Sequence, residues 1–164
     1  MAAITVAAAA GLVGMTARYS AGYDEASHLC RDADDLRRRA TQLADADGEA
    51  YAAVLAALRD RAKDDDGGAR VRATLVEATE VPLAIVDCAR RTVLVGVPLF
   101  ISGNKNLRGD VLTAVTLAEA GAVSAAHLVR INSRRGDLDG SHVETAAIWC
   151  AETRDAVRRV QGLL

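Results

Sequence analysis

Aromatic side chains are scarce in this sequence of 164 residues, which has one Phe, one Trp and three Tyr. Hydrophobic residues nevertheless make up 51% of the chain, and most of them are Ala, Val and Leu. A core with so few rings must be filled by small aliphatic side chains, which suits closely packed helices better than a sheet. Proline, which breaks helices, occurs only twice. The composition therefore predicts an all-α bundle, and the length fits a single domain over residues 1–164.

An excess of charge of either sign is also lacking, because the formal net charge is −2. No electrostatic field draws such a chain to nucleic acid or to anionic lipid, so we expect neither as a partner. The apolar run Ala2–Met15 has no basic segment before it and is too short to span a bilayer. We expect this run to form a buried helix of a cytoplasmic protein.

Metal-binding patterns are missing as well. The three cysteines and the three histidines are scattered, and none has a second potential ligand at metal-binding spacing. An odd number of distant cysteines indicates reduced thiols, as in the cytoplasm, and predicts no disulfide framework. We therefore expect no metal.

The hydrophobic pattern predicts about five helices, two or more of them long, separated by glycine-bearing breaks. Pro82 lies inside the third helix, where it should kink the helix and free a backbone carbonyl one turn earlier. Ser141 and Glu144 read as a capping box that opens the last helix, with His142 exposed in its first turn. The connections are expected at Asp64–Gly68, which is acidic, at Val97–Leu107 and at Gly136–Gly140. The helices are expected at about Ala2–Ser20, Asp24–Arg61, Ala69–Val95, Arg108–Ser133 and Ser141–Leu164.

The second helix carries one carboxylate where its pattern calls for an apolar residue. Asp47 falls on the stripe that should face the core, whereas Asp45 points roughly 160° away from it and should be solvated. Burial disfavours the charged form of a carboxyl group, which is how such a group becomes a general acid near neutral pH. The plainer alternative is an Asp that merely pairs with a neighbouring helix. The stripe consists of Leu29, Ala33, Leu36, Ala40, Leu43, Asp47, Ala50, Val54 and Leu58.

Five stretches of the sequence, in this order, resemble the cyclodeaminase/cyclohydrolase family. Its members include the C-terminal domain of formiminotransferase-cyclodeaminase and stand-alone methenyltetrahydrofolate cyclohydrolases. The stretches are Gly11-Leu-Val-Gly-Met-Thr-Ala-Arg-Tyr19, Ala44-Asp-Ala-Asp-Gly-Glu-Ala-Tyr51, Ala78-Thr-Glu-Val-Pro-Leu83, Gly103-Asn104 followed by Asp110, and Val129-Arg-Ile-Asn132.

The resemblance implies a helical bundle that dimerises and binds a reduced folate, with one glutamate or a polyglutamate tail, between helices, without a metal or a further cofactor. The implied reactions are loss of ammonia from 5-formiminotetrahydrofolate and interconversion of methenyl- and 10-formyltetrahydrofolate. The family's acid/base aspartate lies in the motif Asp45 to Tyr51, and the stripe favours Asp47 over Asp45. As a hypothesis, Asp110 and Asn132 would face the pterin. Candidates for the anionic glutamate tail are Asn104, Lys105, Arg108 and Arg130, the last of which could instead be an interface residue.

Two departures from the family keep a second interpretation open. Members usually begin with a further helix and a Pro-Gly-Gly-Gly-Ser turn, whereas this sequence starts at Met1 directly on the alanine-rich helix. Members often carry Lys after the glycine that ends this helix, and here Tyr23 follows Gly22. The alternative is therefore a catalytically inactive bundle of the same fold, which binds folate or only assembles with a partner.

Overall fold

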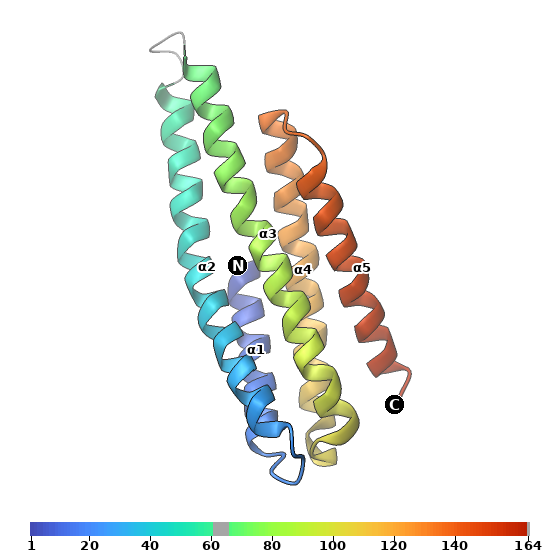
Figure 1. Ribbon diagram of the computed structural model, residues 1–164. Helices are drawn as coiled ribbons and strands as arrows, with labels where there is room; N and C mark the ends of the chain where they lie inside the picture. The colour runs from blue at the N-terminus through green and yellow to red at the C-terminus, as the bar shows by residue number, and fades with distance from the viewer. Residues whose placement is uncertain (61–65, 164) are drawn as a thin grey trace.

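The computed structural model describes residues 1–60 and 66–163, and within these ranges it is helical, with no strand (Figure 1). The long helices α2 and α3 run antiparallel, α4 returns beside α3, and α5 packs on both α3 and α4. Helix α1 lies against α2, α4 and α3. The all-α prediction is confirmed. The elements are α1 (Ala2–Arg18), α2 (Ala26–Asp60), α3 (Gly67–Ser102), the 3-10 turn η1 (Lys105–Leu107), α4 (Arg108–Gly136) and α5 (Ser141–Gln161).

Small residues allow the helices to approach closely, as the composition predicts. A Cβ on Gly121 of α4 would lie 2.6 Å from Val6 Cγ2 of α1, and one on Gly96 of α3 would lie 2.9 Å from Val115 Cγ1 of α4. Gly14 of α1 similarly lies against α2. The absence of a Cβ therefore lets α4 approach α1 and α3 closely, and the two larger core clusters take residues from all five α-helices.

A separate, smaller apolar cluster joins α2 and α3 near the ends linked by the 61–65 segment, at the top of Figure 1. Its members belong to these two helices alone, and none belongs to either of the two larger clusters. The bundle thus thins towards this end. The cluster consists of Val54, Ala57, Val71, Leu75 and Ala78, with Ala50 packed against it.

The connection after α3 differs from the prediction. Residues 97–102 are helical rather than a loop, and α3 continues through Pro98 to Ser102. Proline removes one hydrogen bond from a helix and its ring crowds the carbonyl one turn earlier, but burial of Leu99 and Phe100, each 1% exposed, holds the extra turn in place. The loop predicted for Val97–Leu107 is therefore reduced to Gly103 and Asn104, followed by η1.

The start of α5 also differs in detail. Gly140 is the N-cap, and the Oδ1 atom of Asp139 accepts hydrogen bonds from the backbone N–H and the hydroxyl of Ser141. The side chain that accepts a hydrogen bond from a backbone N–H at the start of α5 is therefore that of Asp139, and not that of Ser141 as the capping-box prediction had it. His142 is partly buried rather than exposed. The predicted ends at Arg61 and Leu164, and Asp64 of the acidic connection, lie outside the described residues.

Within the described residues, one segment, Lys105–Gly136, is long and apolar enough to cross a membrane by length and composition alone. The core helix of a bundle passes the same test, and α4 packs against α1, α3 and α5. Its buried face consists mainly of Ala, Gly and Val. We therefore assign the apolar character of α4 to helix packing.

Candidate functional site

A cavity of about 660 Å³ lies between α2, α3 and α4, beside the small α2–α3 cluster. Among the described residues that line it, Asp47 is the only acid and Arg135 the only base. Most of the remaining lining is aliphatic, which is typical of a site that takes an organic ligand and orients it through a few polar groups. The lining residues are Asp47, Ala50, Tyr51, Val54, Leu55 and Leu58 of α2, Val71, Leu75 and Ala78 of α3, and Leu128, Ile131, Asn132 and Arg135 of α4.

Asp47 reaches the cavity because of its place on the stripe of α2. The members of the stripe from Leu29 to Leu43 are buried against the other helices, and Asp47 follows one turn later, where the packing opens and its side chain is partly buried. Asp45 is exposed and does not line the cavity. The structure therefore favours Asp47 over Asp45 as the carboxyl group that a bound molecule would meet.

Asn132 enters the same cavity from α4, and a hydrogen bond fixes its side chain. Its Nδ2 atom donates to the backbone carbonyl of Ala78 over 2.7 Å. Residue 82, four positions after Ala78, is a proline and has no N–H to give that carbonyl. The carbonyl freed by Pro82 is thus satisfied by a side chain from another helix.

Asp47 and Asn132 lie at about the same height in the bundle. The Sγ atom of Cys88 in α3 donates to the carbonyl of Leu36 in α2, which sets the register of these antiparallel helices. Ten residues further along each helix, roughly 15 Å away, Ala78 lies level with residues 46 and 47. Because Asn132 is bonded to Ala78, the carboxyl group and the amide face one ligand-sized space from two helices.

The remaining predicted residues on the α3–α4 connection are not brought to this cavity within one chain. Asp110 is 22 residues before Asn132 on α4, and the two are therefore about 33 Å apart along the helix axis. Asn104, Lys105 and Arg108 lie at that same far end. Within one chain these four residues are therefore too far from Asp47 to contact the same ligand.

Two of these four residues have contacts that stabilise the fold. The Nδ2 atom of Asn104 donates to the carbonyl of Tyr19, and its Oδ1 atom accepts from the backbone N–H of Asn106. The Nε atom of Arg108 donates to the carbonyl of Phe100, and its guanidinium group lies 5.3 Å from the centre of the Phe100 ring. Both side chains therefore hold the end of α3 and its connection in place.

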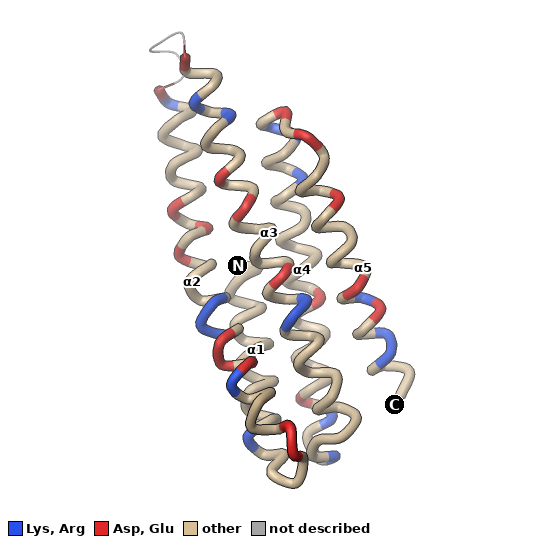
Figure 2. The backbone as a smooth tube through the Cα atoms, viewed as in Figure 1, with Lys and Arg blue, Asp and Glu red and all other residues tan. Residues whose placement is uncertain are grey.

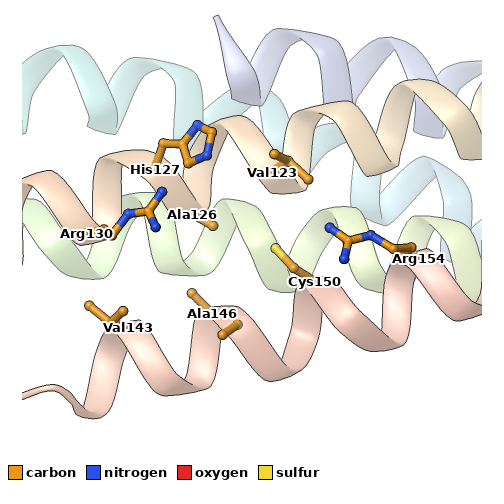
Figure 3. A pocket seen from close by; sticks show the side chains of 9 residues that line it. Val123, Ala126, His127, Arg130, Val143, Ala146, Cys150 and Arg154 are labelled. Atoms are coloured by element: carbon orange, nitrogen blue, oxygen red, sulfur yellow. The ribbon is translucent and has the colours of Figure 1, made fainter.

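Arg130 lies apart from the cavity, in a groove of about 180 Å³ between α4 and α5 (Figure 3). Its guanidinium group and that of Arg154 point toward one another along this groove, with Cys150 between them. Burial raises the pKa of the Cys150 thiol, while the charge of Arg154 acts in the opposite direction. The predicted contact of Arg130 with the ligand of Asp47 is thus not seen in this chain.

Two polar residues of the described cavity lining were not singled out from the sequence. Tyr51 is 63% exposed at the rim, one turn after Asp47, and Arg135 is exposed in the last turn of α4. Tyr51 belongs to the motif that starts at Asp45, so its presence could have been anticipated. Arg135 carried no such signal, since basic residues in the last turn of a helix are common.

Comparison with known proteins agrees with this arrangement of helices. The family model described as formiminotransferase-cyclodeaminase matches residues 1–147, which is most of the chain. The chain belongs to the formiminotransferase-cyclodeaminase family. Among solved structures, the crystal structure of formiminotetrahydrofolate cyclodeaminase from Thermotoga maritima is similar, with a TM-score of 0.89 and 23% sequence identity. The similarity covers 99% of this chain and 84% of that chain. No curated protein matches significantly.

The formiminotransferase-cyclodeaminase match includes all the elements that form the cavity. Helices α2, α3 and α4 lie wholly within residues 1–147, as do Asp47, Asn132 and Arg135. Most of α5 lies beyond that range. The cavity is thus a feature of the part of the chain that defines the family.

Proposed function

We propose that this chain acts on one-carbon units carried by tetrahydrofolate, as a formiminotetrahydrofolate cyclodeaminase or a methenyltetrahydrofolate cyclohydrolase. The observation that carries the proposal is the meeting of Asp47 and Asn132 from separate helices in one apolar-walled cavity. Its volume of about 660 Å³ falls in the range of pockets that take organic ligands. Membership of the family supports the substrate class.

In this proposal Asp47 transfers the proton on which either reaction depends. In the deaminase direction, N10 attacks the formimino carbon and loses its proton. The departing nitrogen takes up that proton and a second one from the carboxyl group of Asp47, and it leaves as ammonia as its bond to the carbon breaks. In the hydrolase direction, the carboxylate takes a proton from the water that attacks the methenyl carbon, and it returns this proton to N5 as the bond between that carbon and N5 breaks. The remaining hydroxyl proton passes to solvent as the formyl group forms on N10. Apolar neighbours such as Val54 and Leu55 limit the access of bulk water to the reacting carbon. The proposal requires no metal and no cofactor beyond the folate itself.

The test is the loss of absorbance of 5,10-methenyltetrahydrofolate above its spontaneous hydrolysis, with ammonia release from 5-formiminotetrahydrofolate measured in parallel. Asp47→Asn keeps the shape of the side chain but cannot transfer the proton, and we expect it to lower the rate by about 10²- to 10⁴-fold. Asp45→Asn is the matched control, since Asp45 is exposed and lies outside the cavity.

Three outcomes would change the assignment. A rate that falls in Asp45→Asn and not in Asp47→Asn would keep the function and move the acid/base role to Asp45. Equal rates in both variants and the parent chain would remove both aspartates from the chemistry. No turnover of either substrate would favour the inactive helical bundle.

We also propose that the chain forms a homodimer in the cytoplasm. Met1, the N-cap of α1, and Ile4 are exposed, as is Leu117 of α4, the helix against which α1 packs. Figure 2 shows few charges along α1 and along the middle of α4. An uncharged face with exposed aliphatic side chains suits contact with a second copy. The mass of the chain in solution, measured by light scattering, tests this proposal.

A further inference from the structure

We propose that Pro82 is a positioning residue, which fixes the amide of Asn132 so that its oxygen accepts hydrogen bonds from the N–H groups of the pterin ring. The inference rests on the proposed function for the identity of the ligand. The fixed orientation of the amide is inferred separately, from the hydrogen bond between Asn132 of α4 and Ala78 of α3.

The first step concerns the carbonyl of Ala78. In an uninterrupted α-helix this oxygen would accept from the N–H of residue 82, and proline has none. Ala78 is 6% exposed, so water does not readily replace the missing donor, and a buried carbonyl without a partner is costly. The Nδ2 atom of Asn132, 2.7 Å away, supplies the donor from α4.

The second step concerns the orientation of the amide. A carbonyl oxygen can only accept, so the nitrogen end of the Asn132 amide must face Ala78. The reverse orientation would bring two oxygen atoms together at hydrogen-bond distance. One N–H of Asn132 is therefore occupied, and its Oδ1 atom and second N–H are left for whatever fills the cavity that Asn132 lines.

The third step concerns the ligand. A reduced pterin carries N–H donors on its pyrimidine ring, at the 2-amino group and at N3, and these need acceptors. The Oδ1 atom of Asn132 is such an acceptor, at the level of the Asp47 carboxyl group. An asparagine free to rotate would present a donor part of the time and would bind this edge less tightly.

The stability arm of the test is a double-mutant cycle on the whole chain, which does not depend on activity. Asn132→Ala leaves the Ala78 carbonyl without a partner, and we expect the melting temperature to fall by about 3–8 °C. In the Pro82→Ala background, residue 82 regains an N–H that can bond to the Ala78 carbonyl. The same Asn132→Ala change should therefore lower the melting temperature by less than half as much. Pro98→Ala is the matched control, because Pro98 lies in the same helix and no described side chain donates to the carbonyl of Leu94, four residues earlier.

The spectroscopic arm observes the amide directly. The chain has only three asparagines and two glutamines, so a ¹⁵N spectrum contains five pairs of side-chain amide signals. We expect the Asn132 pair, identified by its loss in Asn132→Ala, to exchange slowly with solvent. It should shift and exchange faster in Pro82→Ala, and should remain unchanged in Pro98→Ala. If the Asn132 signals had the same shift and exchange rate in Pro82→Ala as in the parent chain, the positioning role would be overturned. It would also be overturned if Asn132→Ala lowered the melting temperature as much in the Pro82→Ala background as in the parent chain.

The ligand arm measures the affinity for 5-formyltetrahydrofolate, which carries the same pterin edge. We expect Pro82→Ala to weaken binding by about 5- to 10-fold, which corresponds to one hydrogen bond, and Pro98→Ala to leave it unchanged. Equal affinity in Pro82→Ala and the parent chain would refute the acceptor role of Asn132. A parent chain that does not bind the compound would refute the folate assignment, whereas the fixed amide would stand on the other two arms.

Discussion

Gly121 lies where α4 crosses α1, and its replacement by alanine is expected to destabilise the bundle. The new Cβ would lie 2.6 Å from Val6 Cγ2 and 3.4 Å from the carbonyl oxygen of Ala2. Val6 is fully buried, so it has no free space into which to move. The two helices must therefore separate or Val6 must leave its preferred rotamer, either of which costs about 1–3 kcal/mol. Alanine also favours the helix over glycine by about 1 kcal/mol, so the net loss is roughly 0–2 kcal/mol.

Gly48 provides the matched control for this substitution. It lies inside α2, and nothing is within 4 Å of the position that its Cβ would take. Gly48→Ala should therefore show the helix preference alone and stabilise the chain by about 0.5–1 kcal/mol. The two variants are expected to differ by about 1–3 kcal/mol in the free energy of unfolding.

Urea unfolding followed by circular dichroism measures both free energies. Val6→Ala combined with Gly121→Ala should recover part of the loss, because it removes the side chain that the new Cβ meets. If Gly121→Ala stabilised the chain as much as Gly48→Ala, the close approach of α1 and α4 would be refuted.

Two further substitutions test other contacts. Asn104→Ala removes the hydrogen bonds to Tyr19 and Asn106 and should lower the free energy of unfolding by about 1–2 kcal/mol without changing the KM for a folate. A large rise in KM with unchanged stability would restore its predicted role as a ligand. The pKa of Cys88 is raised by burial to about 11, above the value of its unfolded state. The stability that its neutral thiol contributes is therefore fully present below pH 9 and lost as the pH rises towards 11. In urea unfolding at pH 8–11, Cys88→Ala should remove the fall in the free energy of unfolding that the Cys88 thiol causes. A pH profile that is the same in Cys88→Ala and the parent chain would refute this role of Cys88.

The helices could be predicted from the sequence because their hydrophobic period is regular. The stripe of α2 identified the buried face from Leu29 to Leu43 and the one carboxylate that interrupts it. The end of α3 could not be predicted in the same way. Pro98 is a valid local signal for a break, but the burial of Leu99 and Phe100, which depends on the other helices, outweighs it.

The candidate site could be predicted only in part, for a related reason. The pattern predicted that Pro82 would free a carbonyl, but the partner depends on the register between α3 and α4, and no local pattern contains that register. Asn104 and Arg108 show the opposite case. Their polar side chains near the start of a helix suggested that they bind a ligand. In the structure they instead donate hydrogen bonds to the backbone carbonyls of Tyr19 and Phe100.

The small cluster between α2 and α3 has a consequence for the dynamics of the molecule. Its apolar contacts are separate from those of the two larger clusters. Residues 66–78 of α3 are also held to α4 by the hydrogen bonds of Arg72 and Asn132, so residues 50–60 of α2 are the segment that can open while the rest of the bundle stays folded. Val54, Val71 and Leu75 belong to this cluster and also line the cavity. The wall of the cavity that α2 forms can therefore rearrange without unfolding of the two larger clusters. A molecule can enter and leave through such local openings, on a timescale set by this end of α2 and not by unfolding of the whole bundle.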